Sequence, residues 1–203
     1  GPSSWKLALN LNHFSADEEG MKKLILLLLC LPLQAFGFVE LNAFYFSKSE
    51  TTATTSTAGY TFLEATLGFR VDRQGQYLVG WGYASHSESI SGSSTTTYAS
   101  SQMGPRFLWM IDKQKTWSLG FAYYIVTSAS YSSGSGSADT WKGTALHVDG
   151  GYNMPVGDSF YASLRLNYSA ATYSELLTGG TSYSTISYAK TYIYPSVAAV
   201  YIW

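Results

Sequence analysis

Apolar and polar residues alternate with a period of two along most of the chain after residue 37. In one such stretch Leu63, Ala65 and Leu67 share one face, whereas Glu64 lies on the other. A period of two is typical of β-strands whose faces meet different surroundings, and no stretch sustains the 3.6-residue period of a helix. The pattern predicts eight strands, at residues 38–47, 60–71, 76–86, 97–110, 117–130, 141–154, 160–173 and 187–203.

The segments that join these strands are of two kinds, which alternate along the chain. Three are short turns, at 72–75, 112–115 and 155–158, and four are long and rich in Ser, Thr and Gly, at 48–59, 87–96, 131–140 and 174–186. Outer-membrane barrels show this asymmetry, with short turns in the periplasm and long loops outside the cell. The predicted fold class is all-β: an eight-stranded antiparallel up-and-down transmembrane β-barrel with short periplasmic turns and long extracellular loops, over residues 38–203.

The composition agrees with a protein whose outer face meets lipid. Charged residues make up 12% of the chain and aromatic residues 16%, which is poor in charge for a soluble surface. The mean hydropathy of -0.01 fits a membrane protein only if each strand has one apolar and one polar face. The formal net charge is -1, so there is no electrostatic reason to expect nucleic acid as a partner.

The residues before the first strand have the pattern of an export signal. Met21-Lys22-Lys23 is a positively charged start, an apolar run follows at 24–33, and small residues for cleavage lie at 35–37. The apolar run is shorter than the ~20 residues that a transmembrane helix needs. We expect residues 21–37 to be a signal peptide that is removed before Phe38, and residues 1–20 to be a leader outside the native structure.

The last strand ends in alternating apolar residues and a terminal aromatic, at Val197, Ala199, Tyr201 and Trp203. This ending resembles the signal that the barrel-assembly machinery reads, and with the preceding strands it resembles small outer-membrane barrels of the OmpA/OmpX type. The resemblance implies a bacterial outer-membrane location, with outer-membrane lipid and the assembly machinery as partners. The chain stops at Trp203, so we do not expect the periplasmic domain of OmpA. Pro195 interrupts the pattern and is expected where a missing N–H is tolerated, such as a bulge.

Seven ionisable residues fall on strand faces that point into the predicted lumen: Glu40, Glu64, Arg70, Arg106, His147, Asp149 and Arg165. Pairing Met154 with Phe160 across the turn at 155–159 places Asp149 opposite Arg165, and the antiparallel first two strands place Glu40 near Arg70. An unpaired charge in a low-dielectric lumen is costly, so we predict an ion-pair network that fills the barrel. The alternative is a gated conduction path in which the pairs exchange partners.

Two small clusters have residue types that catalysis uses. One is His86-Ser87-Glu88, and the other is His147 with Asp149 on the same strand face. Small outer-membrane barrels include lipid-modifying enzymes, for which a His near a Ser would supply a base and a nucleophile. Neither cluster has a third orienting group at a defined spacing, and the three histidines are scattered. We predict no enzyme activity, no cofactor and no metal site, with a lipid-modifying outer-membrane enzyme as an alternative.

Small or weakly apolar residues gather on the outward faces of the fourth and sixth predicted strands: Ala99, Ser101, Met103, Pro105, Thr144 and Gly150. Small residues permit close approach between protein surfaces in membranes. These six residues are a candidate protomer interface of a symmetric homo-oligomer, which would be a porin-like or lipid-enclosing assembly. The main prediction is an integral outer-membrane barrel with a structural or surface-interaction role and a side-chain-plugged lumen.

Overall fold

A computed structural model of the chain describes residues 37–51, 55–134, 138–178 and 183–203. The expected leader at 1–20 and the expected signal peptide, up to residue 36, lie outside the described residues. Within the described ranges, no helix is long and apolar enough to cross a membrane.

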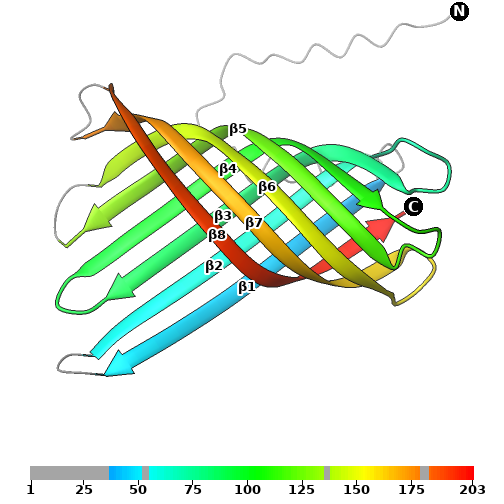
Figure 1. Ribbon diagram of the computed structural model, residues 1–203, viewed down its shortest axis with the longest axis horizontal. Coiled ribbons are helices and arrows are strands. Elements are labelled where there is room, and N and C mark those ends of the chain that lie inside the picture. The colour runs from blue at the N-terminus through cyan, green and yellow to red at the C-terminus, as the bar shows by residue number, and fades with distance from the viewer. Residues whose placement is uncertain (1–36, 52–54, 135–137, 179–182) are drawn as a thin grey trace, which may run out of the picture. The chain divides into compact units, whose positions relative to one another are not determined.

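In the part of the chain that the structure describes, eight strands pair with their sequence neighbours in antiparallel fashion, and the last pairs with the first to close the ring (Figure 1). They are β1 (Phe38–Thr51), β2 (Thr55–Arg70), β3 (Tyr77–Ser91), β4 (Thr95–Met110), β5 (Trp117–Ser133), β6 (Asp139–Pro155), β7 (Phe160–Leu177) and β8 (Tyr183–Ile202). The predicted fold class, an eight-stranded antiparallel up-and-down barrel, is confirmed.

The alternation of residue types explains which side chains point into the barrel. Along β4, Gln102, Arg106 and Leu108 are buried, while the intervening Met103 and Phe107 are exposed. Successive side chains of a strand point to opposite faces, so a closed sheet sends every second residue inward. Many large apolar side chains lie on the exposed face, whereas Glu40, Arg106, Asp149 and the other buried charged side chains point inward.

The four predicted long loops are largely strand, which corrects the expected loop lengths. β1 runs to Thr51 and β2 begins at Thr55, within the predicted loop at 48–59, and Thr51 pairs with Thr55. The ladder between β3 and β4 similarly continues to the pair Ser91 and Thr95. β-Branched Thr favours the strand conformation, and each strand here continues a ladder that already holds its neighbour in place. The polar composition of these segments therefore did not end the strands.

The register between β6 and β7 differs by two residues from the prediction. Met154 pairs with Ala162 rather than with Phe160, because both strands continue to the pair Pro155 and Tyr161 before the chain turns. Asp149 consequently lies opposite Asn167 instead of Arg165. A shift of two residues keeps every side chain on its predicted face, so the error changed which residues lie directly opposite each other but not their inward direction, and Arg165 still reaches Asp149.

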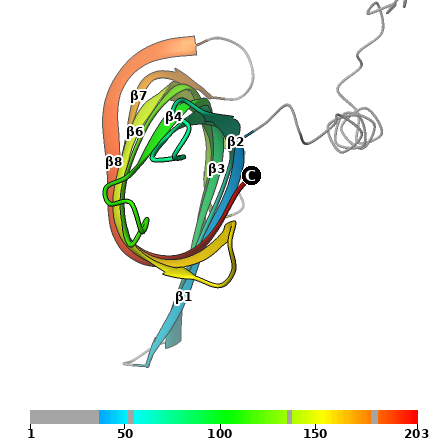
Figure 2. The same cartoon turned by 90° about the vertical axis from the view of Figure 1, so that its right-hand side faces the viewer.

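The seam between β1 and β8 is closed along only part of its length. Its ladder runs from Phe38 and Ile202 to Ala43 and Val197, although both strands continue well beyond those residues. Figures 1 and 2 show the far ends of β1 and β8 diverging, with β1 projecting away from the ring. Only this ladder stops so early, since the other seven continue toward the far ends of their strands in the described residues.

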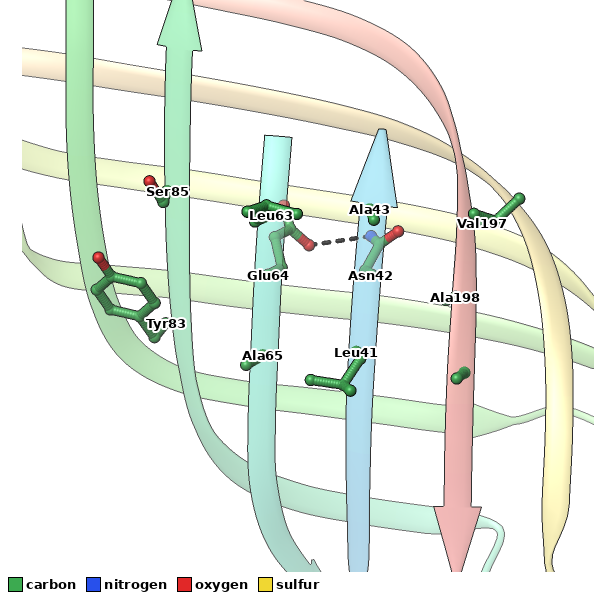
Figure 3. Close-up of a pocket in the computed structure, with 11 residues that line it drawn as sticks. Leu41, Asn42, Ala43, Leu63, Glu64, Ala65, Tyr83, Ser85, Val197 and Ala198 are labelled. Atoms are coloured by element: carbon green, nitrogen blue, oxygen red, sulfur yellow. Dashed lines mark hydrogen bonds between the residues drawn. The ribbon is translucent and has the colours of Figure 1, made fainter. Parts of the chain in front are cut away.

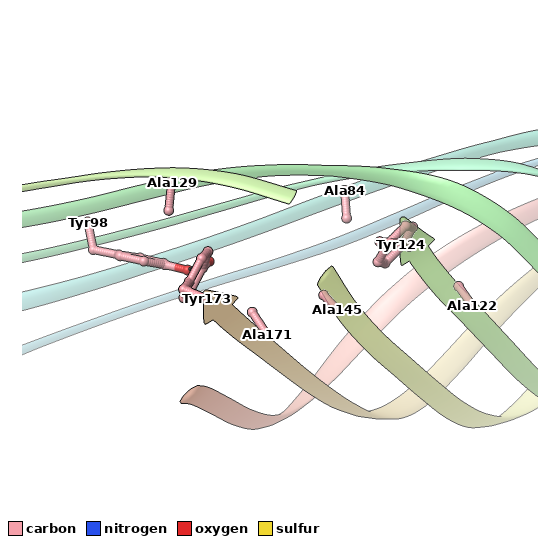
Figure 4. Packing of buried hydrophobic residues seen from close by; sticks show 8 residues of the cluster. All are labelled: Ala84, Tyr98, Ala122, Tyr124, Ala129, Ala145, Ala171 and Tyr173. Atoms are coloured by element: carbon pink, nitrogen blue, oxygen red, sulfur yellow. Dashed lines mark hydrogen bonds between the residues drawn. The ribbon is translucent and has the colours of Figure 1, made fainter. Parts of the chain in front are cut away.

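The barrel interior has an apolar layer on each side of a polar one. Near the short turns, the buried layer consists of Phe38, Leu78, Leu108, Met110, Tyr161, Val200 and Ile202. Toward the opposite end, Tyr98, Tyr124 and Tyr173 pack with five buried alanines (Figure 4), and the hydroxyls of Tyr98 and Tyr173 form a hydrogen bond. The ionisable residues lie between these layers.

Candidate functional site

Four charged side chains from four different strands meet in the middle of the lumen. Arg106 on β4 donates from Nε to Glu40 Oε2 at 2.7 Å, and its Nη2 lies 2.8 Å from Asp149 Oδ2. Arg165 on β7 donates from Nη1 to Asp149 Oδ1 at 2.8 Å and also pairs with Glu40. Each arginine therefore joins the same two carboxylates, one on β1 and one on β6.

Glu64 on β2 organises a second group of contacts beside this cluster. Its Oε1 lies 2.9 Å from His147 Nδ1 and 3.8 Å from His86 Nε2, and it accepts a hydrogen bond of 2.8 Å from the Tyr194 hydroxyl. Asn42 donates to its Oε2 at 3.1 Å (Figure 3). His147 also approaches Asp149, with Nε2 3.5 Å from Oδ2, and so lies between the two groups.

Polar side chains extend the network to the neighbouring strands. Asn42 donates to Asn167 Oδ1 at 3.2 Å, and Asn167 donates to Ser196 Oγ at 2.7 Å. The sequence analysis assigned none of Asn42, Asn167 and Tyr194 to the network. Their place on the inward side of the alternation is the signal that could have identified them.

The network is shielded from solvent along its whole length. Glu40, Arg106, His147, Asp149 and Arg165 are each at most 3% exposed. Three carboxylates face two guanidinium groups and two imidazoles, so every acid has at least one basic neighbour. Because removing one partner of a buried pair leaves an uncompensated charge, the cluster constrains which strands can lie beside each other.

Arg70 does not belong to this cluster, which corrects the predicted pairing with Glu40. The side chain of Arg70 is exposed at the turn end of β2, two residues beyond Gly68, which pairs with Phe38. Glu40 lies farther along the barrel, opposite Thr66, and its partners are Arg106 and Arg165. Glu40 therefore pairs with arginines on β4 and β7, which are distant in the sequence, and not with Arg70 on the adjacent β2.

The His86-Ser87-Glu88 cluster does not assemble a base and a nucleophile. His86 is 1% exposed and points into the lumen, where its ring lies 4.7 Å from that of Phe62, whereas Ser87 is exposed on the opposite face. Adjacent strand residues point to opposite faces, which separates the hydroxyl from the imidazole. Among the described residues, no group of three or more His, Cys, Asp and Glu side chains is arranged to hold a metal ion.

The six residues of the candidate protomer interface lie on the outward face. Ala99, Ser101, Met103 and Pro105 are exposed on β4, Gly150 is exposed on β6, and Thr144 is half-buried. A hollow of about 400 Å³ lies in the same region, and its lining includes Ser85, Ala99, Ser101, Ser128 and Ser130.

The four residues of the expected assembly signal end the chain. Val197, Ala199 and Tyr201 lie on the outward face of β8, and Trp203 follows the strand. The Trp203 backbone N–H donates to the Gly37 carbonyl at 3.2 Å, which ties the chain end to the start of the barrel.

No family model matches the chain, and no curated protein matches it. A solved structure that resembles it is the crystal structure of Neisserial surface protein A (NspA). The two share 15% identity, with 82% of this chain and 96% of that chain covered and a TM-score of 0.47. The class of this protein follows from its own strand pairing: an eight-stranded antiparallel β-barrel with buried ion pairs in its lumen.

Proposed function

We propose that this protein is an integral outer-membrane β-barrel with a structural or surface-interaction role and a lumen plugged by side chains. The main support for this proposal is that apolar side chains lie on the outside of the barrel and charged ones on the inside. Leu41, Trp81 and Leu164 are more than half exposed on the outside, while Glu40 and Arg106 are buried within. In water this arrangement would leave a large apolar surface unburied, whereas a bilayer covers it.

The aromatic residues support the same placement. Near the short turns, Tyr77 stacks beside Trp109, and Trp117 lies 5.2 Å from Tyr152 between ring centroids. Farther along the strands, outward-facing tyrosines that include Tyr83, Tyr123 and Tyr168 are about two-fifths exposed. Two bands of amphipathic rings are typical of barrels at the two membrane interfaces.

The three-layer lumen supports a plug over a conduction path. The ion-pair cluster is covered by the apolar layer with Leu108 and Met110 on one side and by Tyr98 and Tyr173 on the other. Ions would have to displace both layers and separate buried charge pairs, which costs several kcal/mol for each ion. We propose no catalytic role, because the inward His86 and the outward Ser87 cannot act on one substrate.

The test combines gel migration with electrical recording. We expect the unheated barrel from membranes to migrate faster on an SDS gel than the boiled chain, and planar bilayers that contain it to show no single-channel steps. Equal migration of heated and unheated samples would contradict the membrane barrel. Steady conductance of the monomer would contradict the plug and favour the gated path.

A second candidate is a homo-oligomer, of porin-like or lipid-enclosing type, that assembles through the outward face of β4 and β6. The observation that favours it is the hollow beside Ser101, whose small side chains leave room for close contact. Ser101→Trp would fill the hollow and convert a heat-sensitive multimer into a monomer. Leu164→Trp, on the outward face of β7, is the matched control. A multimer that survives Ser101→Trp would exclude this surface.

A further inference from the structure

The open part of the β1–β8 seam begins at a proline. On β8, Trp203 donates its backbone N–H toward β1, and Ile202 donates to the Ser159 carbonyl on the β7 side at 2.8 Å. Backbone groups alternate in direction along a strand, so the odd-numbered residues of β8 face β1. Pro195 is the first odd-numbered residue beyond the last pair, Ala43 and Val197, and it has no N–H to donate.

The missing N–H of Pro195 thus lies where the ladder stops, on an unpaired strand edge, which is a place that tolerates it although it is not a bulge. It pairs in regular register with Leu166 on its other side, where the even-numbered neighbours make the hydrogen bonds. The irregularity between β7 and β8 lies elsewhere, between Tyr173 and Glu175. A proline at this place also discourages an added strand from pairing with the open edge of β8.

The open seam contains an apolar groove of about 420 Å³. Its lining is formed by Phe44, Phe46, Tyr60, Phe62, Tyr192, Ile193, Tyr194 and Pro195. The rings of Phe62 and Tyr194 stack at 4.1 Å between centroids, so β8 contacts β2 directly at this level. A volume of this size lies within the range of roughly 300 to 1,000 Å³ that is common for small-molecule sites.

The two tyrosines that β8 contributes to the groove lining both have their hydroxyls bonded to carboxylates. The Tyr194 hydroxyl donates to Glu64 at 2.8 Å, and the Tyr192 hydroxyl donates to Glu88 at 3.0 Å. Both tyrosine hydroxyls are thus bonded to carboxylates on the lumen side, and the rings present carbon atoms to the groove. A sugar or another polar ligand would find few partners there, whereas an unbranched hydrocarbon chain would not need them.

The groove also adjoins the surface that would meet lipid. Ile193 and Tyr45, which flank the open seam on the outward face, are each more than 70% exposed. Below the seam, a second hollow of about 800 Å³ includes Leu41, Ala43 and Val197 on its lining (Figure 3). The two hollows lie on either side of the end of the ladder, one beside Val197 and the other beside Pro195, so an apolar chain at the outer surface has the seam next to it.

We infer that the open β1–β8 seam binds an acyl chain of a membrane lipid, which enters sideways past Pro195 and lies against Phe62 and Tyr194. The inference rests on the proposed membrane placement and adds a lipid-binding site to it. A strand from a second copy fits the seam less well, because Pro195 removes the first backbone donor that such a strand would use.

A photoactivatable phosphatidylcholine with a diazirine on its acyl chain tests this site. The barrel is isolated from membranes of cells that express the full chain, reconstituted in phosphatidylcholine vesicles that contain the probe, irradiated and mapped by mass spectrometry. We expect labelling of the outward Leu41 and of the inward Phe62 and Tyr194. Leu108, which is inward but remote from the seam, should stay unlabelled.

A reversible disulfide provides the matched control. Continuing the β1–β8 register past Pro195 would place residue 47 opposite residue 193, so oxidised Ser47→Cys/Ile193→Cys should close the groove entrance while Pro195 is kept. Labelling of Phe62 and Tyr194 should be lost on oxidation and return on reduction. The pair Ala43→Cys/Val197→Cys locks a contact that already exists and should leave the labelling unchanged.

The outcomes separate the site from the membrane placement. Labelling of Leu41 without Phe62 and Tyr194 overturns the lipid site and leaves the membrane barrel standing. Absence of labelling at Leu41 as well overturns the membrane placement itself. Seam labelling that persists in the oxidised Ser47→Cys/Ile193→Cys protein, or a seam crosslinked to a second copy instead of lipid, would also overturn the inference.

Discussion

Gly120 on β5 lies directly opposite Asp149 on β6, and the missing side chain of this glycine makes the space that the carboxylate occupies. A Cβ built at Gly120 would lie 2.7 Å from Asp149 Cγ, closer than side chains approach each other. Asp149 is held there by Arg106 and Arg165, so it has little freedom to move aside. A small residue on one strand thereby permits a buried ion pair on the next.

Gly120→Ala is expected to lower the free energy of unfolding by about 1 to 3 kcal/mol, as overpacking of a filled interior does. Urea unfolding in phospholipid vesicles, followed by tryptophan fluorescence, measures the change. Gly150→Ala is the matched control on β6, because a Cβ there meets only the Ser118 carbonyl oxygen at 4.0 Å. Equal losses in the two variants would show that the space beside Asp149 is not limiting.

Glu40→Gln should be among the most destabilising single changes in the lumen. It leaves Arg106 and Arg165 facing one carboxylate fewer, and breaking a buried ion pair from one side costs about 3 to 5 kcal/mol. The expected readout is loss of the fast-migrating unheated band at a lower temperature. Arg70→Gln, a change on an exposed side chain, should leave that temperature nearly unchanged, and a comparable effect would argue for the predicted Glu40 and Arg70 pair after all.

Lys115→Gly is expected to stabilise the barrel. Lys115 closes the turn between β4 and β5 with a φ of 58°, and Gly75 holds the equivalent place, with a φ of 66°, in the turn between β2 and β3. The left-handed conformation costs a non-glycine residue about 1 to 2 kcal/mol, and glycine avoids this strain. Part of the gain is lost, because glycine also increases the conformational entropy of the unfolded chain. Urea unfolding should show a gain for Lys115→Gly and a loss for Gly75→Ala. A loss in both would mean that the Lys115 side chain supports the turn.

Asp112 should make the stability of the same turn depend on pH. The backbone N–H of Trp117 donates to its carboxylate at 3.0 Å, which holds the pKa of Asp112 below the ordinary value of 3.8. Because the folded pKa is the lower one, the contribution is present above pH 3.8 and disappears as the pH falls through the folded value.

Unfolding of the wild type and of Asp112→Asn across this range measures that contribution. We expect a difference in stability at neutral pH that vanishes in acid. Lys113→Gln changes the charge of the turn without touching the carboxylate and should show no such convergence. A difference that stays constant down to strongly acidic pH would indicate that the carboxylate charge is not responsible.

The alternation of residue types was enough to predict the number of strands, their antiparallel order and the inward direction of Glu64, Arg106 and Asp149. These properties depend on the local period of two, which any strand residue reports without knowledge of its partners. The alternation did not predict the partners of Arg70 correctly, because the face on which a residue lies gives no information on its position along the barrel axis. It also ended the strands early at Ser- and Thr-rich segments, where a neighbouring ladder continued the pairing.

The contacts of the site depend on register and closure, which combine residues far apart in the chain. Glu40 is 66 residues from Arg106 and 125 from Arg165, and a shift of one strand by two residues exchanges such partners while every side chain keeps its face. Pro195 was recognisable in the sequence as a break in the pattern. The sequence does not show that the missing N–H of Pro195 would have pointed toward β1, at a seam beside an apolar groove. Only the closed barrel determines this, because the direction of hydrogen bonds between distant strands is a non-local property.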